Sequence, residues 1–298
     1  MRRNLSIKWK REISGWLFAS PWIIGLILFN LVPLIYSLFL SLTKYPIIGK
    51  PQFIGFTNYR EIFIGEDTLF WQSLKVTATY VVMAIPLNLS LGLFLALLAN
   101  LKIRGISWVR LLYYIPIAIP PIVSAILWKW ILTPDLGLLN YYLEKFFGIK
   151  GPTWFYSEEW AIPAFVLINL WTVGYTMIIY LAGLQSIPQA LYEAAEIDGA
   201  SSWRRLWNIT IPMMTPYIFF TLILGIISSF QIFGPAYIMT QGGPNNATLF
   251  YVFYLYRAGF QWFKMGYASA LAWVLAIILI IITLAQFRVA KKWVYSEI

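Results

Sequence analysis

Residues 267–287 read YASALAWVLAIILIIITLAQF and contain no charged side chain. A helix needs about 20 such apolar residues to cross the hydrocarbon core of a bilayer. Five more stretches have the same character, at 16–40, 76–99, 108–132, 161–184 and 215–238. In chain order, only the third of the six spans, 108–132, contains charged residues, with Arg110 near its start and Lys129 near its end. We therefore predict an all-α, polytopic membrane protein with six transmembrane helices.

The composition supports this prediction and excludes several chemistries. Of the 298 residues, 60% are apolar and 11% are charged, whereas soluble domains carry about 25% charged residues. The chain contains no cysteine and no histidine, which excludes disulfides, thiol chemistry, and zinc or haem sites with these ligands. We expect no metal site and no catalytic residue. The net charge of +10 is interpreted as membrane topology, so no nucleic-acid partner is expected.

Lysine and arginine indicate the orientation, because cytoplasmic loops of membrane proteins are enriched in them. With the N-terminus inside, the inner segments hold 13 of the 22 basic residues and 5 of the 12 acidic ones. The outer segments hold the rest and are closer to balance. We therefore expect a multi-pass chain in contact with the lipid bilayer, with both termini in the cytoplasm.

The predicted spans divide the chain into five segments. These are a cytoplasmic N-terminal segment 1–15, a first transmembrane helix 16–40, an outer loop 41–75, a five-helix core 76–287 with the inner loop 185–214, and a cytoplasmic tail 288–298. Three outer segments, 43–75, 133–160 and 239–266, are rich in helix breakers. Each is longer than a simple connection requires, so we expect them to dock a partner protein.

Prolines interrupt the third span, which contains Pro116, Pro120 and Pro121. A proline inside a helix removes a backbone hydrogen bond and leaves a carbonyl that must find another partner. We expect a kink or a break in this span. A packing kink and a broken helix that opens a transport pathway remain alternatives.

The inner loop contains the sequence SIPQALYEAAEIDGASSWRRLWNITIP, residues 186–212. It predicts two short helices, the first capped by Ser186 and ended by Gly199 in a left-handed conformation. Ser201 or Ser202 is expected to cap the second helix, and Pro212 and Pro216 are expected to close the loop and lead into the fifth span. Trp203, Leu206 and Trp207 form an apolar face on that helix. Such a hairpin inserts into a groove of a partner or lies on the lipid headgroups, and the pattern leaves both alternatives open.

Part of this hairpin carries a specific resemblance. The segments Glu193-Ala194-Ala195 and Asp198-Gly199-Ala200, followed by Ile209, Ile211-Pro212 and Pro216, resemble the EAA signature of permease subunits of binding-protein-dependent ABC importers. Three other segments resemble the carbohydrate-uptake branch of this family, which is related to the maltose, multiple-sugar and glycerol-phosphate permeases. They are FIGFTNY at 53–59, MTQGGP at 239–244 and ASALAW at 268–273.

The resemblance implies a type I ABC importer permease in a prokaryotic cell (inner) membrane. It implies four kinds of partner: a second, often non-identical permease, two ATPase subunits, an extracytoplasmic solute-binding protein, and a sugar. It also implies that the hairpin couples to the ATPase through Glu193, Ala194, Ala195, Asp198, Gly199, Ala200, Trp203, Leu206 and Trp207. The chain lacks the phosphate-binding Gly-x-x-x-x-Gly-Lys-Ser/Thr sequence, so we expect no cofactor and no enzyme activity here, with ATP bound by the ATPase subunits.

Six polar residues of spans four and five are the candidates for sugar contact: Asn169, Thr172, Tyr175, Ser228, Ser229 and Gln231. A sugar pathway needs hydroxyl and amide groups at membrane depth and does not need charge. Hydrogen bonds between helices explain the same residues equally well.

Two other classes of membrane protein fit the sequence less well. An ion-coupled secondary transporter usually places an ionisable residue at mid-membrane, and these spans have none at their centres. That class of transporter remains the alternative. An intramembrane protease would need histidines or paired carboxylates within the spans, and neither is present.

Overall fold

The computed structural model of the chain describes residues 7–65 and 67–295. Within these residues the regular secondary structure is helical apart from one short two-stranded hairpin. The chain divides into two compact units, residues 1–66 with 255–276 and residues 67–254 with 277–298. Parts of the predicted terminal segments, 1–6 and 296–298, lie outside the described residues.

The first unit begins with a long apolar helix. Its elements are α1 (Ile7–Leu26), the π-helical turn η1 (Ile27–Leu31), α2 (Val32–Ser41), strands β1 (Thr43–Lys44) and β2 (Gln52–Phe53), α3 (Thr57–Ile64) and the π-helical turn η4 (Arg257–Gln261). The stretch Arg11–Ser41 is apolar and long enough to cross a membrane. The predicted first span, 16–40, is therefore helical throughout and extends further toward the N-terminus.

Asn58 ties the end of α2 to the strand hairpin within this unit. Its buried side-chain amide donates to the carbonyls of Ser41 and Thr43, at 2.8 and 2.9 Å. Thr43 pairs with Phe53 across the antiparallel strands. Gly266 approaches the same corner so closely that a Cβ there would lie 2.0 Å from the Thr43 carbonyl oxygen. These contacts give a structural reason for the asparagine in the segment 53–59.

The second unit contains most of the helices. They are α4 (Thr68–Ala99), α5 (Ile106–Ala118), α6 (Pro121–Ile131), α7 (Leu138–Phe147), the 3-10 turn η2 (Trp154–Tyr156), α8 (Glu158–Trp171), α9 (Gly174–Ser186), α10 (Gln189–Ile197), α11 (Ser202–Arg205), the π-helical turn η3 (Leu206–Thr210), α12 (Ile211–Phe230) and α13 (Gly234–Met239). Two further helices, α14 (Tyr251–Tyr256) and α15 (Met265–Ala290), have residues in both units.

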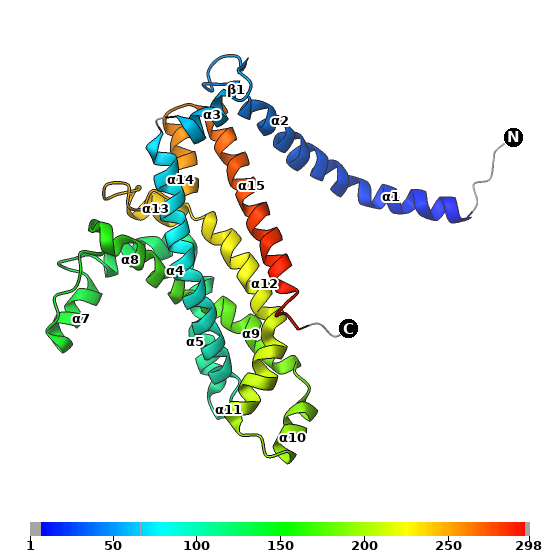
Figure 1. The fold of residues 1–298 in the computed structure, drawn as a ribbon, viewed down its shortest axis with the longest axis vertical. Coiled ribbons are helices and arrows are strands. Elements are labelled where there is room, and N and C mark those ends of the chain that lie inside the picture. Colours follow the sequence, from blue (N-terminus) through cyan, green and yellow to red (C-terminus); the bar gives the residue numbers. More distant parts are fainter. Residues whose placement is uncertain (1–6, 66, 296–298) are drawn as a thin grey trace. The chain divides into compact units, whose positions relative to one another are not determined.

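The central helix of the second unit is α4, which packs against α8, α9 and α12 (Figure 1). Its 32 residues reach about 48 Å, more than a bilayer core requires. The Asp67 carboxylate caps its start by accepting the Leu69 N–H at 3.0 Å. At its other end the Arg110 guanidinium donates to the Ala99 carbonyl at 2.7 and 3.0 Å. The arginine in the third predicted span therefore pairs with a helix end.

Helix lengths agree with the predicted spans. In the described chain four helical stretches are long and apolar enough to cross a membrane: Arg11–Ser41, Thr68–Ala99, Ser202–Met239 and Met265–Ala290. Two bent pairs bring the number to six when each pair is one span. The chain bends by 101° between α5 and α6 and by 45° between α8 and α9. The break expected around Pro116, Pro120 and Pro121 is thus present, between Ala118 and Pro121.

Two local predictions for the inner loop were wrong. Ser186 does not cap a new helix. It is the last residue of α9, where its hydroxyl donates to the Gly183 carbonyl at 2.8 Å, and Pro188 occupies the N-cap position of α10. Pro212 does not close the loop either, because helix continues across it from α11 into α12. The π-helical turn η3 ends at Thr210, two residues before Pro212, and its wider hydrogen-bond spacing accommodates the missing proline N–H.

Candidate functional site: a polar cavity and a helical hairpin

A cavity of about 670 Å³ lies within the second unit, where three helical segments are interrupted. Ile119 separates α5 from α6, Thr172 lies between α8 and α9, and Gln231 and Ile232 separate α12 from α13. All four of these residues line the cavity. Irregular backbone at membrane depth is tolerated where it is buried or lines a cavity, and such breaks offer peptide groups to a ligand.

The lining of the cavity is mostly apolar and carries uncharged hydroxyl and amide groups. Its hydroxyl and amide side chains are Tyr80, Asn88, Ser124, Asn169, Thr172, Tyr175, Thr176, Thr221, Ser228, Ser229 and Gln231. The other lining residues are apolar or glycine, so none of the lining residues that the structure describes is Asp, Glu, Lys or Arg. Hydroxyls and amides both donate and accept hydrogen bonds, as a sugar hydroxyl also does.

Asn88 links three helices beside this cavity. Its amide donates to the Asn169 side-chain oxygen at 2.9 Å, and its own oxygen accepts from the Thr176 hydroxyl at 2.7 Å. These bonds join α4 to α8 and α9. A second bond, 2.6 Å between the hydroxyls of Tyr180 and Thr221, joins α9 to α12. The polar groups therefore fix the walls of the cavity as well as line it.

All six residues predicted for sugar contact line this one cavity: Asn169, Thr172, Tyr175, Ser228, Ser229 and Gln231. Three of them use their side chains within the protein. Asn169 bonds to Asn88, and the hydroxyls of Thr172 and Ser228 donate to backbone carbonyls of their own helices. In the described chain the side chains of Tyr175, Ser229 and Gln231 have no hydrogen bond, so they are available to a ligand. Whether any of the six contacts a sugar remains a prediction.

The sequence analysis missed the part of the lining that comes from α4. Asn88 is the only side-chain amide in the predicted span 76–99, and Tyr80 precedes it by two helical turns. The rule that selected residues in spans four and five, polar groups at membrane depth, would have selected Asn88 as well.

The hairpin of α10 and α11 turns at Gly199, as predicted. Gly199 has φ +73°, in the left-handed region that favours glycine. The Ala200 N–H bonds to the Ala195 carbonyl at 2.8 Å, and the Gly199 N–H bonds to the Glu196 carbonyl at 3.0 Å. This pair of bonds is a Schellman motif, which satisfies the last carbonyls of α10. Ser201 caps α11 by accepting the Arg204 N–H at 3.3 Å.

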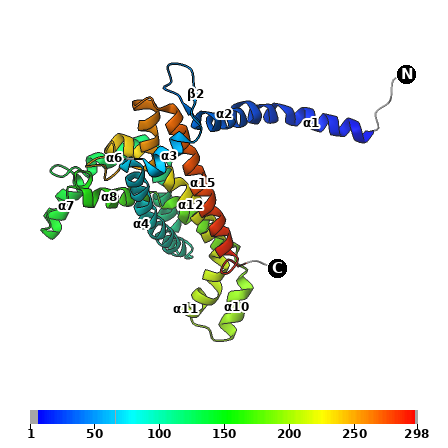
Figure 2. The ribbon, with the colours of Figure 1, turned by 45° about the horizontal axis from the view of Figure 1, so that its top comes forward.

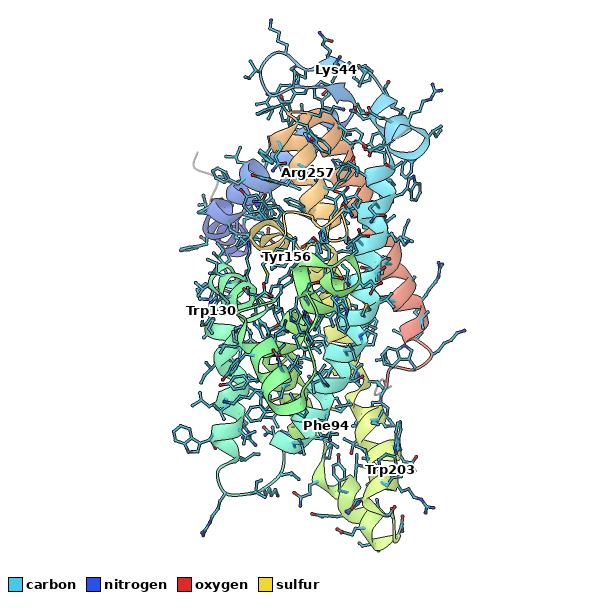
Figure 3. The ribbon with its side chains drawn as sticks, turned by 90° about the vertical axis from the view of Figure 1, so that its left-hand side faces the viewer. Lys44, Phe94, Trp130, Tyr156, Trp203 and Arg257 are labelled. Atoms are coloured by element: carbon cyan, nitrogen blue, oxygen red, sulfur yellow. The ribbon has the colours of Figure 1, made fainter. Side chains whose placement is uncertain are left out.

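The hairpin presents large apolar side chains to its surface. Figure 2 shows α10 and α11 side by side at the bottom of the view. Ile197 is 87% exposed, Trp203 is 68% exposed and Trp207 is 53% exposed. The two indole rings lie 5.7 Å apart, edge to face, and Figure 3 marks Trp203 on this surface. Single exposed apolar residues are common, but a group of this size on one small hairpin fits contact with a protein partner or with lipid headgroups.

The other residues predicted for coupling divide between the surface and the inside of the hairpin. Glu193, Ala194, Asp198 and Gly199 are exposed, whereas Ala195, Ala200 and Leu206 are half-buried. Within the described chain Glu193 has no hydrogen bond or ion pair, so its carboxylate is available to a partner. Their role in coupling remains a prediction.

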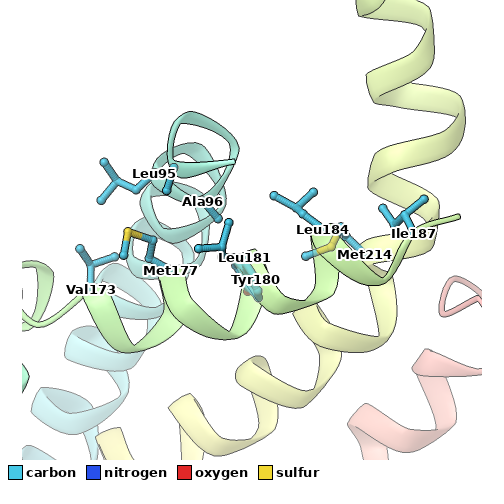
Figure 4. Packing of buried hydrophobic residues seen from close by; sticks show 10 residues of the cluster. Leu95, Ala96, Val173, Met177, Tyr180, Leu181, Leu184, Ile187 and Met214 are labelled. Carbon is cyan, nitrogen blue, oxygen red and sulfur yellow. The ribbon is translucent and has the colours of Figure 1, made fainter. Parts of the chain in front are cut away.

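The base of the hairpin is rooted in a packed apolar cluster (Figure 4). Leu184 of α9, Ile187 between α9 and α10, and Met214 of α12 are all buried there. Leu95 and Ala96 of α4 belong to the same cluster. Because protein interiors are close-packed, a displacement of the hairpin must move these helices rather than be absorbed by a void.

Comparison with known proteins identifies the family. Residues 88–293 match the family described as the binding-protein-dependent transport system inner membrane component. The chain belongs to this family. The match covers the hairpin and all of the cavity lining except Tyr80 and Ile85. It excludes the ion-coupled secondary transporter that the sequence had left as an alternative.

Three members of this class resemble the chain along most of its length. The probable ABC transporter permease protein YesP of Bacillus subtilis is 42% identical, over 100% of this chain and 96% of YesP. The sulfoquinovosyl glycerol transport system permease protein SmoG of Agrobacterium fabrum is 36% identical, over 89% of this chain and 85% of SmoG. The crystal structure of a bacterial ABC transporter involved in the import of the acidic polysaccharide alginate contains a chain that is 26% identical, with a TM-score of 0.81. The match covers 95% of this chain and 98% of that chain. The fold is therefore that of an ABC importer permease.

Proposed function

We propose that this permease forms the translocation pathway for a sugar or an oligosaccharide. The cavity carries the proposal, because it combines uncharged hydroxyl and amide groups with three breaks in the surrounding helices. Its volume of about 670 Å³ lies in the range of small-molecule sites. The sugar substrates of SmoG and of the alginate transporter support the same class of cargo.

The proposed transporter contains four other protein subunits. A second permease, identical or not, would complete the pathway, and two ATPase subunits would drive it. An extracytoplasmic binding protein would deliver the sugar. Since this chain has no phosphate-binding Gly-x-x-x-x-Gly-Lys-Ser/Thr sequence, we assign ATP binding to the ATPase subunits and no cofactor to this chain.

The hairpin of α10 and α11 is the proposed docking site for an ATPase subunit. Exposed Ile197, Trp203 and Trp207 supply apolar contact, and Glu193 supplies a charge for a basic residue of the partner. With this hairpin in the cytoplasm, the predicted orientation places both termini there. The segments 43–75, 133–160 and 239–266 would then meet the binding protein outside.

The cavity is tested by alanine substitution of its six predicted residues in the complete transporter, with membrane levels measured for each variant. Replacement of Tyr175, Ser229 or Gln231 should raise the KM for sugar uptake several-fold, because these side chains are not already bonded within the chain. Ser90→Ala is the matched control, since Ser90 is exposed on α4 and does not line the cavity. Normal uptake in all six variants would place the sugar site elsewhere, on the second permease.

The absence of cysteine makes the partners accessible to site-specific crosslinking. A single cysteine at Ile48, which is 87% exposed, should crosslink to the binding protein. A single cysteine at Ile197, equally exposed on the hairpin, should crosslink to the ATPase instead. The opposite pattern, or crosslinks to the ATPase at both positions, would contradict the proposed orientation.

A further inference from the structure

Lys129 lies one helical turn from the cavity wall. Ala125 lines the cavity and is buried, and Lys129 follows it by four residues on the same face of α6, about 6 Å farther along the helix. The Lys129 ammonium lies 3.4 Å from the carbonyl oxygen of Ile238. Ile238 is itself one turn beyond Pro235, a lining residue of α13. The ammonium therefore lies where α6 and α13 each run one turn beyond a lining residue, which we call the rim of the cavity.

The charge of Lys129 is not neutralised by the described part of the chain. Its ammonium has three N–H donors, and the Ile238 carbonyl is the one acceptor that it reaches. No carboxylate lies within ion-pair distance, since the ion pairs of the described residues are Arg205–Glu196 and Lys264–Glu61. Lys129 is exposed in the last turn of α6, where a long side chain can reach the membrane interface, and charged side chains within a span are commonly retained for function.

Acidic residues are scarce on the helices that line the cavity. Among α4, α5, α6, α8, α9, α12 and α13, acidic side chains occur only at the first two residues of α8, Glu158 and Glu159. Phe165 is the first residue of α8 that lines the cavity, about 10 Å along the helix from Glu158. The Glu158 carboxylate also accepts a hydrogen bond from the Asn245 amide, at 2.5 Å. On these helices Lys129 is four residues from the lining residue Ala125, and both acidic side chains are farther along the chain from the nearest lining residue of their helix, Phe165.

We propose that Lys129 makes this cavity selective for saccharides that carry a carboxylate. The inference rests on the proposed function, because it assigns the acidic group of a sugar that the neutral lining binds through its hydroxyls. The ammonium would exchange its long contact with Ile238 for a charge-assisted hydrogen bond to the carboxylate, which is shorter and stronger. Lys129 is thus a specificity-determining residue for the transported sugar.

The number of charges favours a carboxylate over a phosphate. A phosphate monoester carries a charge of about −1.5 to −2 at neutral pH and has three strong acceptor oxygens. The rim offers a single ammonium, and the lining offers no arginine to hold two oxygens at once. One lysine matches the single charge of one uronate unit.

The test measures binding to the complete transporter in lipid nanodiscs, without the binding protein, by equilibrium dialysis. The probes are a disaccharide of two glucose units and the same disaccharide with one unit replaced by glucuronate. We expect the wild type to bind the glucuronate probe about tenfold more tightly at low salt, with the ratio falling as salt screens the charge. The ratio should fall to about one in Lys129→Met and should persist in Lys129→Arg. Lys75→Met is the matched control, since Lys75 is exposed on α4 and does not line the cavity.

The outcomes separate this inference from the proposed function. The ratio of the two affinities is the readout, because a general loss of folded protein lowers both equally. Equal affinities in the wild type, or an unchanged ratio in Lys129→Met, would show that Lys129 only extends to the membrane interface, and would overturn the inference. In that case Gln231→Ala should still weaken binding of both probes. If neither probe binds the wild type, the cavity is not a sugar site and both proposals fall.

Discussion

The carboxylate of Glu196 lies 3.2 Å from the guanidinium of Arg205, and this ion pair joins α10 to α11 across the turn at Gly199. A hydrogen bond of 2.9 Å between the hydroxyls of Tyr192 and Thr210 joins the same two arms nearer their base. The hairpin therefore has its own internal support. Glu193, three residues before Glu196, has no such bond within the described chain. Glu196 therefore supports the hairpin internally, whereas the carboxylate of Glu193 is available to a partner.

Loss of the Glu196–Arg205 pair should have a small effect. The Glu196 side chain is 68% exposed, and exposed ion pairs contribute about 0–1 kcal/mol, so Glu196→Gln should weaken association with the ATPase by less than about fivefold. Glu196→Arg should do more, because it places two like charges together. Co-purification of the ATPase from membranes measures the effect. The exchange Glu196→Arg with Arg205→Glu is the control and should restore association, and a failure to do so would assign Glu196 a contact with the partner.

The cavity wall should be sensitive to a single added methyl group at Gly174. A Cβ at this position would lie 1.9 Å from the Tyr113 carbonyl oxygen, so Gly174→Ala must push α9 away from α5. Overpacking of this kind costs about 1–3 kcal/mol. We expect a lower midpoint of thermal unfolding and reduced sugar uptake. Gly234→Ala is the matched control, because nothing lies within 4 Å of a Cβ there, and equal stability of the two variants would contradict the close contact.

The sequence was sufficient to predict the spans and the hairpin turn, because both depend on local properties. Apolar length determines the spans, and Gly199 is the one strong helix breaker between Gln189 and Arg205. The six pathway candidates were also local choices, polar groups in spans four and five. That they line one cavity depends on how α8, α9 and α12 pack, which no single segment specifies.

What could not be predicted depends on contacts between distant segments. Asn88 reaches Asn169 and Thr176 across three helices, and only the packing of α4 reveals that these residues form one network. The continuity of α11 with α12 was missed because Pro212 was expected to close the loop. A π-helical turn removes that conflict, and it has no simple sequence signature.

The C-terminal tail should detach when its aromatic contact is removed. The Trp293 ring lies 6.1 Å from Phe219 of α12, and the Tyr295 N–H donates to the Thr215 hydroxyl at 2.8 Å. An aromatic pair contributes about 0.5–1.5 kcal/mol beyond its buried area, so Trp293→Ala should accelerate local opening up to about tenfold. Limited trypsin digestion after Lys292 measures this opening. Val289→Ala is the control, because Val289 is 57% exposed, and equal digestion of the two variants would mean that the ring contact does not hold the tail.

The last prediction concerns transmission of ATPase motion by the hairpin. It uses two substitutions, one that strains the backbone and one that reverses a charge. Gly199→Val strains the backbone, because φ is +73° and a β-branched residue tolerates this region poorly. Nothing lies within 4 Å of a Cβ at Gly199, so the cost, about 1–2 kcal/mol, comes from the backbone alone. Gly199→Asn is the matched control, since asparagine adopts this conformation more readily.

Glu193→Lys leaves the backbone unchanged and reverses the charge that the partner meets. Both variants should insert normally, because neither residue packs in the apolar cluster at the hairpin base. Gly199→Val should lower sugar-stimulated ATP hydrolysis while Gly199→Asn retains most of it. Glu193→Lys should lower association with the ATPase, and a matching charge reversal on the ATPase should restore it. The hairpin is packed at its base around Ile187 and Met214, so it transmits to the helices only the motion that its tip receives from the ATPase. Full sugar uptake and full sugar-stimulated ATP hydrolysis in Glu193→Lys or Gly199→Val, at normal membrane levels, would therefore show that the substituted residue has no role in coupling.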